Sequence, residues 1–413
     1  MIRIFPIDNL SLPCPVCGAQ VKGVSDYLFT GVYFLARQHC PSCTESYLQT
    51  LPVGHAHQFP ISLSGDGSKM INENQVPSWW GDPLLEILKY KKWIELPISK
   101  KILRKANRVV LLNCMDDCFG HVFWKLLNAD RHLKQPDIGL ILIIPASFMW
   151  LVPEGVAELW VIDAPLSRLS MGIQNLDAFL KEEIKRFDEV YLSKAYVHLD
   201  HTQVDISKFI KTKRFDLNQF EKKRPQITFI MREDRFWLAN QLDEFFYKVC
   251  IKFKLLSRFK GYFIFRQNRL FNRTANALQE KMPDSCITAT GLGTSGRLNK
   301  NIVDRRVKQV DLEMEKKWCD IYAQSHIVFG VHGSNMIIPT SLAAGFINIL
   351  PHYKIDNMSE DIAFSSNTRY TLFLGRHLAA FVRPWLVVRH MISMIKLFPQ
   401  VKDNMDPLTT ENS

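Results

Sequence analysis

The sequence has no long uninterrupted apolar segment. Its most apolar runs, Ile138–Trp150 and Val156–Ile162, are broken by a proline and by an acidic residue. Neither approaches the roughly 20 residues that a helix needs to cross a bilayer, so we expect no membrane span. The first residues, MIRIFPIDNLSLPC, lack the basic start and apolar core of a secretory signal. Because internal repeats and low-complexity blocks are also missing, we expect an ordinary folded protein in the cytoplasm.

The overall composition sets the size and charge class. The 413 residues are 47% hydrophobic and 23% charged, as in soluble globular proteins, and suffice for two domains with a small appendage. The formal net charge is +11. This charge favours anionic partners such as nucleotides, a phospholipid surface or nucleic acid.

Four of the nine cysteines have metal-ligand spacing. Two CxxC motifs, each with proline after the first cysteine, are separated by a segment whose Tyr27–Leu35 part indicates paired strands. Two such knuckles place four thiolates around one tetrahedral zinc ion. We therefore expect a structural zinc ribbon in residues 1–60. Its predicted ligands are Cys14, Cys17, Cys40 and Cys43.

Other interpretations of the cysteines stay open. Two disulfides would require an oxidising compartment, and a redox CxxC fits poorly with two matching pairs. His39, His55 or His57 could replace a cysteine as ligand. The other five cysteines share no ligand spacing and are expected to be buried apolar residues: Cys114, Cys118, Cys250, Cys286 and Cys319.

The rest of the chain indicates two α/β lobes. A polar linker is expected at Ser62–Gly81, a first lobe in residues 82–215, a second lobe in residues 226–375 and a C-terminal helix in residues 376–400. Strands of the first lobe are expected at Arg108–Asn113, Gly139–Ile144, Glu158–Ile162 and Glu189–Leu192. The predicted fold class is therefore α/β, with two Rossmann-like lobes preceded by a small zinc-ribbon module.

The segment Ser325–Pro351 is the most informative part of the second lobe. It has the pattern of a buried strand, a glycine-bounded turn, a helix ended by Gly345 and a second buried strand. The turn consists of Gly330, Val331, His332, Gly333, Ser334 and Asn335. Its glycines permit a ligand to approach the backbone, and Ser334 or Asn335 could cap a helix whose N-terminus favours phosphate. A plain helix–strand joint with an idle histidine is the alternative.

The same segment resembles the HG-A/S signature of glycosyltransferase family 61. The motif residues are His332, Gly333 and Ser334, although the family's more usual third residue is alanine. A preceding helix at Val310–Tyr322 keeps the family's order, and Ile227–Glu233 resembles its strand-then-arginine opening of the C-terminal lobe. The resemblance implies GT-B architecture, a nucleotide-sugar donor in the C-terminal lobe, an acceptor that meets the sugar in the cleft, and inverting transfer without a catalytic metal.

Donor binding requires positive charge near the diphosphate. Sugar departure leaves extra negative charge on the nucleoside diphosphate, which arginines and helix N-termini can stabilise. Arg232 and Arg235 follow the first strand of the second lobe, but Arg232 could instead form a surface ion pair with Glu233 or Asp234. The predicted donor-binding residues are Arg232, Arg235, Arg297, Gly330, His332, Gly333, Ser334 and Asn335.

A literal GxGxxG pattern at Gly291–Gly296 could indicate a dinucleotide site. The strand before it is weak and no convincing helix follows it. We expect a flexible loop over the donor instead, from which Arg297 could reach a phosphate.

An inverting transfer needs a base that takes the proton of the acceptor hydroxyl. The loop Cys114–His121 follows a predicted strand and precedes a helix, where ligand-facing residues of α/β sheets lie. Asp117 and His121 are the candidates, and we favour His121 because the pKa of imidazole lies nearer neutrality. Asp116 or Asp117 could instead cap the helix.

The sequence thus predicts a glycosyltransferase of polysaccharide biosynthesis. It would move a hexosyl or pentosyl group from a nucleotide sugar to a glycan or lipid-linked acceptor, with zinc as a structural ion only. The basic helix after Arg383 could contact the inner face of a membrane, although the last helix of GT-B enzymes commonly packs back on the lobes. The alternatives are a zinc-ribbon nucleic-acid-binding protein, disfavoured by the scattered basic residues, and an idle nucleotide-sugar-binding scaffold.

Overall fold

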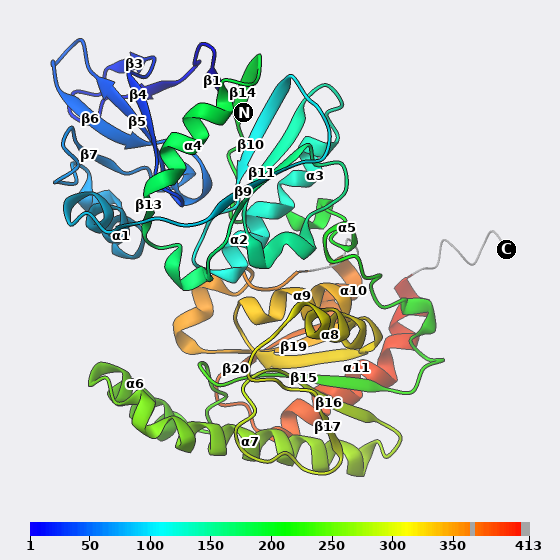
Figure 1. Ribbon diagram of the computed structural model, residues 1–413. Helices are drawn as coiled ribbons and strands as arrows, with labels where there is room; N and C mark the ends of the chain where they lie inside the picture. The colour runs from blue at the N-terminus through cyan, green and yellow to red at the C-terminus, as the bar shows by residue number, and fades with distance from the viewer. Residues whose placement is uncertain (364–367, 406–413) are drawn as a thin grey trace. The chain divides into compact units, whose positions relative to one another are not determined.

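The computed structural model describes residues 1–363 and 368–405 (Figure 1). The chain divides into two compact units after Asp200. Each unit is built around a six-stranded sheet. We describe the units separately.

The sheet of the first unit has a parallel centre with antiparallel edges. Its strand order is β1-β14-β10-β11-β12-β9, with β14 through β12 parallel. The bounds are β1 Ile2–Phe5, β9 Ile98–Ile102, β10 Arg108–Asn113, β11 Gly139–Pro145, β12 Glu158–Ile162 and β14 Glu189–Leu192. The four predicted strands are confirmed. They form because short runs rich in Val, Ile and Leu are covered on both faces of a parallel sheet.

Short helices connect these strands. They are α2 Phe119–Leu127, α3 Ala129–Leu133 and α4 Gln174–Ile184, with the small strand pair β8 Trp93–Ile94 and β13 Gly172–Ile173 beside them. Helix α2 follows β10 directly and buries Val122, Phe123 and Leu126.

The cysteine-containing module forms an antiparallel sheet. Its order is β4-β5-β6-β7, and a separate hairpin pairs β2 with β3. The bounds are β2 Ser11–Pro13, β3 Gln20–Lys22, β4 Asp26–Phe29, β5 Phe34–His39, β6 Ser46–Thr50 and β7 Ser62–Ser64. The predicted strand pairing between the two CxxC motifs is confirmed, since β4 and β5 pair there.

The predicted linker at Ser62–Gly81 is wrong. Its first residues form β7, and helix α1 begins at Ser78 and ends at Lys89. Trp80, Leu84 and Ile87 are buried in one cluster with the module's strands. Helix α1 therefore forms because its apolar residues recur at helical spacing and can be buried, although the residues before it are mostly polar.

The sheet of the second unit is fully parallel. Its order is β17-β16-β15-β18-β19-β20, which is the order 3-2-1-4-5-6 of the Rossmann fold. The bounds are β15 Gln226–Arg232, β16 Cys286–Leu292, β17 Ile302–Asp304, β18 Ile327–Val331, β19 Gly345–Leu350 and β20 Gly375–Ala379. The predicted fold class, with two Rossmann-like lobes of the kind found in GT-B architecture, is confirmed.

Helices cover both faces of this sheet. Helices α7 and α11 lie on one face, and α8 and α9 lie on the other (Figure 1). The bounds are α5 Ser207–Ile210, α6 Gln241–Lys252, α7 Leu256–Lys281, α8 Leu312–Gln324, α9 Ile337–Leu342, α10 Thr368–Leu374 and α11 Pro384–Met405. The apolar face of α11, including Val387, Met391 and Phe398, is buried in the core of this unit. This face therefore packs back on the lobe.

The sequence predicts that Gly345 ends the helix, and this prediction is wrong. Helix α9 ends at Leu342, and Gly345 is the first residue of β19. A Cβ atom at Gly345 would lie 2.6 Å from the carbonyl oxygen of Leu374, so close packing against α10 requires glycine. No helix in the described part of the chain is long and apolar enough to cross a membrane.

Candidate functional site

The first candidate site lies at the topological switch point of the second sheet. There β15 and β18 are neighbours whose connections lead to opposite sides, which opens a crevice beyond their carboxyl ends. Strand β15 ends at Arg232, and β18 ends at Val331, so the first two residues of the predicted turn, Gly330 and Val331, belong to the strand. The arginines and the glycine turn therefore come from the two strands that border this crevice.

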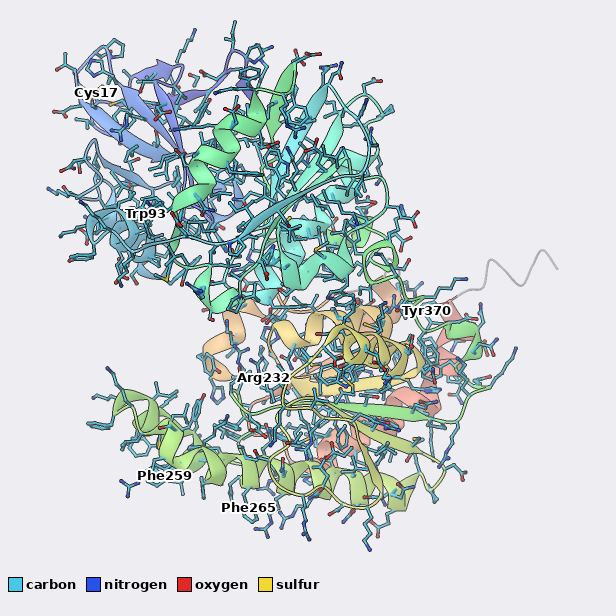
Figure 2. The ribbon with its side chains drawn as sticks, viewed as in Figure 1. Cys17, Trp93, Arg232, Phe259, Phe265 and Tyr370 are labelled. Atoms are coloured by element: carbon cyan, nitrogen blue, oxygen red, sulfur yellow. The ribbon has the colours of Figure 1, made fainter. Side chains whose placement is uncertain are left out.

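Two guanidinium groups converge on this turn. Arg232, labelled in Figure 2, donates from Nη1 to Asn335 Oδ1 at 2.8 Å and pairs with the Asp234 carboxylate. Arg235 donates from Nη1 to the carbonyl oxygen of His332. The alternative of an ion pair with Asp234 is thus observed, but it accounts for only part of the Arg232 side chain.

Gly333 leaves room for both arginines. A Cβ atom there would overlap the Arg235 guanidinium and lie 2.7 Å from Arg232 Nη1. Gly333 also stands before the short 3-10 turn Ser334–Met336, which receives no side-chain cap. The expected capping by Ser334 or Asn335 is therefore wrong, because Asn335 accepts from Arg232 instead.

His332 lies beneath the turn. Its ring is fully buried, and Nδ1 accepts from Asn348 Nδ2 at 2.7 Å while Nε2 donates to the Asn357 carbonyl oxygen at 3.1 Å. Burial and the nearby Arg235 lower the pKa of His332 to about 4. A neutral ring with its proton on Nε2 fits both hydrogen bonds. His332 therefore holds the turn in position from below.

An aromatic pocket of about 360 Å³ lies in the same unit. Its lining includes Phe236, Tyr247, Ile349, Tyr353 and Phe381. Phe236 directly follows Arg235, and the Tyr247 hydroxyl donates to the Asp234 carbonyl oxygen at 3.4 Å. The pocket thus adjoins the segment that carries the two arginines, and its flat apolar walls suit an aromatic ring.

The GxGxxG segment follows β16, the second strand of the Rossmann order. A dinucleotide fingerprint follows the first strand, which is β15 here. Each glycine serves packing: Cβ atoms at Gly291, Gly293 and Gly296 would overlap Met231, Glu233 and Asn268. The Ser295 N–H also donates to Glu233 Oε1 at 2.7 Å. The segment is therefore a loop fastened to its surroundings.

Arg297 lies on this loop and does not share the contacts of Arg232 and Arg235 with the glycine turn. Its carbonyl oxygen accepts from Asn272 Nδ2 at 3.4 Å, and its side chain lines a separate cavity along α7.

The second candidate site lies at the switch point of the first sheet. Here β10 and β14 are the neighbours, and the loop after β10 carries Asp116. Asp116 is buried, and its Oδ1 lies 3.0 Å from His121 Nδ1 while its Oδ2 accepts from Lys125 Nζ at 2.8 Å. Burial opposes ionisation, but Lys125 and His121 hold the pKa of Asp116 far below its usual range. The carboxylate is therefore ionised and orients the His121 ring.

Three histidine rings gather at this site. His55 Nε2 lies 3.4 Å from His121 Nδ1, and the His198 ring centroid lies 6.2 Å from that of His55 and 6.4 Å from that of His121. Burial and the charge of Lys125 lower the pKa of His55 to about 3. The neutral His55 therefore adds no positive charge beside Lys125.

Asp117, the other candidate base, interacts with Asp116 and His121 at the same site. The residue is exposed, and partial burial of its carboxyl group together with the charge of Asp116 raises its pKa. Neither aspartate is the N-cap residue of α2; that residue is Cys118, whose side chain makes no capping hydrogen bond. The capping interpretation is therefore wrong; Asp116 Oδ1 accepts from the Cys118 N–H as a local turn.

The sequence interpretation did not include Lys125 or assign His55 to this site. A signal for Lys125 existed, because it lies four residues after His121 and therefore on the same face of the predicted helix. No comparable signal existed for His55, which lies on the 3-10 turn Gly54–His57 of the preceding module.

Donor atoms of His55, Asp116 and His121 all lie within 4.8 Å of one another. Two histidines and one carboxylate can bind a transition metal ion. The Lys125 ammonium already neutralises Asp116, however, and would repel a cation. The electrostatics thus favour a histidine–aspartate pair.

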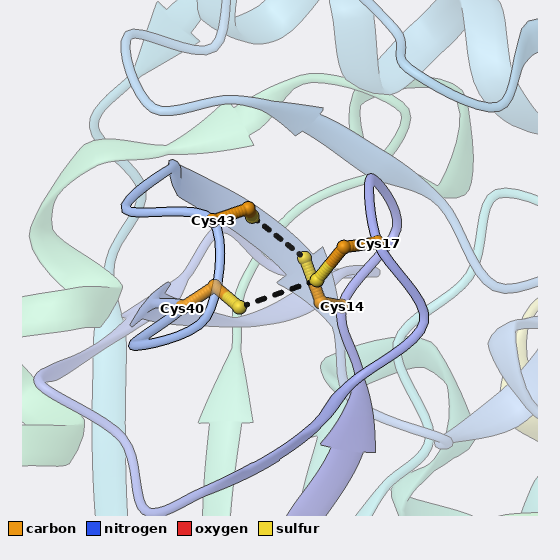
Figure 3. Close-up of side chains that lie close together, drawn as sticks. All are labelled: Cys14, Cys17, Cys40 and Cys43. Atoms are coloured by element: carbon orange, nitrogen blue, oxygen red, sulfur yellow. Dashed lines mark hydrogen bonds between the residues drawn. The ribbon is translucent and has the colours of Figure 1, made fainter.

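The four cysteines converge at one point (Figure 3). Sγ atoms lie 3.7 Å apart for Cys14 and Cys43, and 3.6 Å apart for Cys17 and Cys40. A disulfide needs about 2.05 Å, whereas a tetrahedral zinc ion with Zn–S bonds of about 2.3 Å places sulfurs about 3.8 Å apart. All four donor atoms lie within 4.8 Å of one another, so the cluster can bind a metal ion.

The two CxxC turns have matching backbone geometry. Cys14 N–H donates to Ala19 O at 2.8 Å, and Cys40 N–H donates to Glu45 O at 2.9 Å. Gly18 and Thr44, each four residues after the first cysteine, both have positive φ. Backbone N–H groups of Cys43 and Ser42 lower the pKa of Cys40 to about 6, which favours a thiolate.

The histidines that could have replaced a cysteine ligand have other partners. His39 Nδ1 lies within hydrogen-bond distance of Ser46 Oγ, and the His57 ring packs edge-on against Tyr196. Neither histidine therefore acts as a fifth donor to the cysteine cluster.

Comparisons with known proteins give structural similarities only. No family model matches the chain, and no curated protein matches its sequence. Solved structures with similarity include ADP-heptose LPS heptosyltransferase II of E. coli, with 9% identity over 71% of this chain and 99% of that chain and a TM-score of 0.38. A family 9 glycosyl transferase of Veillonella parvula has 8% identity, 71% and 99% coverage and a TM-score of 0.41. Spinosyn forosaminyltransferase SpnP has 12% identity, 71% and 91% coverage and a TM-score of 0.35. Similarity at this level identifies no function.

Proposed function

We propose that this protein is a glycosyltransferase that moves a sugar from a nucleotide-sugar donor to a glycan or lipid-linked acceptor. The observation that carries the proposal is the pair Arg232 and Arg235 at the switch point of a Rossmann-ordered sheet, beside an aromatic pocket. Such a crevice is where α/β sheets bind nucleotides. The HGS turn, which resembles the motif of glycosyltransferase family 61, lies at the same place.

Two features of the donor site would bind different parts of the nucleotide sugar. The arginines would bind the diphosphate and stabilise the charge that develops as the sugar leaves. The pocket lined by Tyr247 and Tyr353 would hold the nucleobase against aromatic rings. In this proposal His332 supports the turn, and Ser334 and Asn335 line the ligand site. Gly333 leaves room for the two guanidinium groups, whereas Gly330 packs within the sheet against Ile230 and Met336. Arg297 would contribute only if its loop moved.

Proton removal would fall to the first unit. His121, with its side chain 30% exposed, would accept the acceptor hydroxyl proton on Nε2 while Asp116 holds Nδ1. A histidine oriented by a carboxylate is an effective general base. Asp117 remains a weaker candidate, because burial and the charge of Asp116 raise its pKa and so oppose the ionised form that a base requires. This chemistry corresponds to an inverting, metal-independent hexosyl or pentosyl transfer.

The cysteine cluster would bind a structural zinc ion, and the enzyme would act in the cytoplasm, in polysaccharide biosynthesis at the inner face of the membrane. Four thiolates leave no open coordination position for a substrate. Catalysis would therefore not involve this ion.

Nucleotide binding tests the proposal directly. Titration calorimetry with nucleoside diphosphates and their sugars should give binding to the wild type, and Arg235→Gln should weaken it at least about tenfold, as expected for loss of a charge-assisted bond. Arg305→Gln, an exposed arginine of the same unit, is the matched control and should bind like the wild type. Binding of NAD or of nucleic acid in place of nucleotides would overturn the proposal.

Turnover separates an enzyme from an idle scaffold. With the donor identified by binding, His121→Ala should reduce kcat by about 10²- to 10⁴-fold and leave donor affinity unchanged. Asp116→Asn should reduce kcat less and alter its pH profile, because Asp116 acts through His121. Donor binding without sugar transfer to any supplied acceptor would favour the scaffold.

A further inference from the structure

The helical hairpin of residues 241–265 exposes an unusual amount of apolar surface. We call this segment the α6–α7 hairpin. Within it, Leu242, Phe245, Ile251, Phe253 and Phe265 have exposed fractions between 50% and 79%. No other stretch of this length in the described chain exposes as many large apolar side chains. Such a surface commonly marks an interaction site.

These residues are not needed to hold the hairpin in place. Its inner face packs in a separate cluster with Phe236 and Leu238, to which the hairpin contributes Cys250, Phe263 and Ile264. The five exposed residues named above lie outside this cluster. Phe265, labelled in Figure 2, lies on the side of α7 that faces away from the sheet. Ile251 also borders the aromatic pocket, and the apolar surface formed by the other four residues is therefore available to a partner.

Positive charge surrounds the apolar residues. The hairpin carries five basic residues and two acidic ones. Both acids are neutralised locally, Asp243 by Arg266 at 2.8 Å and Glu244 by Lys248 at 3.3 Å. Within the described chain Lys252, Lys254 and Arg258 have no carboxylate partner. The hairpin is therefore locally cationic.

The tip combines both properties in five consecutive residues. All five are exposed: Ile251 and Lys252 end α6, and Phe253, Lys254 and Leu255 connect it to α7. Lys254 has φ 56°, which turns the chain between α6 and α7. Lysine side chains can extend beside apolar residues while their ammonium groups stay at a polar boundary. The tip thus has the composition of a membrane-interface segment.

The positive surface continues along α7. Phe265 borders a cavity of about 540 Å³ that is also lined by Arg269, Arg273 and Arg297. These three arginines are exposed, and four asparagines complete the polar lining. A concave surface with several guanidinium groups suits a phosphate group. It lies next to the apolar residues on the same helix.

We propose that the α6–α7 hairpin binds the surface of an anionic phospholipid bilayer. The apolar residues of the tip insert among the acyl chains, Lys252, Lys254 and Arg258 contact the lipid headgroups, and the arginine cavity accepts a headgroup phosphate. Leucine and isoleucine do not stack on bases, so nucleic acid explains the apolar residues less well. A second copy of the chain would bring like charges together. The inference does not depend on sugar transfer.

Vesicle sedimentation tests this proposal without any turnover. The full chain should bind vesicles of phosphatidylcholine with 30% phosphatidylglycerol, and binding should decrease as salt is raised. Phe245→Ser with Phe253→Ser, and separately Lys252→Glu with Lys254→Glu, should each reduce binding at least about tenfold. All four side chains are exposed, so thermal unfolding should be unchanged.

Two variants provide matched controls. Leu372→Ser removes an exposed apolar side chain of the same unit, and Lys308→Glu with Lys316→Glu makes the same change in net charge outside the hairpin. Both should bind vesicles like the wild type. Equal loss of binding in these controls, or wild-type binding by the hairpin variants, would overturn the proposal. So would hairpin variants that change only the oligomeric mass or the affinity for nucleic acid.

Discussion

The Asp116 carboxylate and the Lys125 ammonium form a buried ion pair, with Oδ2 and Nζ 2.8 Å apart. Lys125 is 1% exposed and also donates to the Met115 carbonyl oxygen. The free-energy cost of burying the ammonium group is therefore offset by its hydrogen bonds to Asp116 and Met115. The pair fixes the carboxylate that contacts His121, and so connects the packing of α2 with the proposed base.

Removal of one member of this pair should destabilise the first unit. We expect Lys125→Met to lower the free energy of unfolding by about 3–5 kcal/mol, because Asp116 would stay buried and unpaired. Lys125→Met with Asp116→Asn should recover part of this loss. Urea unfolding of Lys125→Met, Asp116→Asn and the double variant measures the coupling, and additive effects of the two substitutions would contradict a direct pair.

Loss of the Asp234 charge should strengthen diphosphate binding. Asp234→Asn frees the Arg232 guanidinium and removes a negative charge beside the proposed phosphate position. We expect affinity to rise roughly fivefold, about 1 kcal/mol, measured by titration calorimetry. Glu313→Gln, which removes an exposed carboxylate paired with Lys317, is the control and should change nothing. Weaker binding by Asp234→Asn would argue that Arg232 requires its partner.

Acid should destabilise the second unit before most carboxylates titrate. Burial lowers the pKa of His332 and of His377 to about 4, below the value of about 6.5 in an unfolded chain. The unfolded state therefore binds more protons between these values, and stability is lost as pH falls through this window. Each histidine should contribute a slope of about 1.4 kcal/mol per pH unit.

The slope can be measured by denaturant unfolding between pH 7 and pH 4. His332→Gln keeps a polar side chain and should flatten the dependence, whereas His352→Gln, an exposed histidine, should leave it unchanged. An unaltered slope in His332→Gln would contradict the neutral, buried ring.

The cysteine cluster should contain about one zinc ion per chain. Cys14→Ser with Cys40→Ser should remove the metal and lower the melting temperature, because metal binding contributes to the folding of such modules. Cys250→Ser, a buried cysteine outside the cluster, should keep the metal. Elemental analysis measures this directly. Two ions per chain would instead place a metal on His55, Asp116 and His121.

Much of the fold could be predicted because its signals are local. The strands Glu158–Ile162 and Glu189–Leu192 were predicted with their observed bounds, since short apolar runs between turn residues have few other options. The grouping of Cys14, Cys17, Cys40 and Cys43 was equally clear, because the CxxC spacing itself forms the knuckle. The linker prediction failed because its first residues form β7 and its last residues begin helix α1, which buries Trp80, Leu84 and Ile87.

The sequence by itself determined the α/β class, the four-cysteine cluster and the glycine turn, because spacing along the chain specifies each of them. Only the tertiary structure decided which charges meet. Arg232 faces both Asp234 and Asn335, and His332 lies under its turn rather than beside it. His55 joins Asp116, His121 and Lys125 from a distant segment of the chain. Such pairings depend on how strands align in a sheet, and no periodicity along a single chain encodes that alignment.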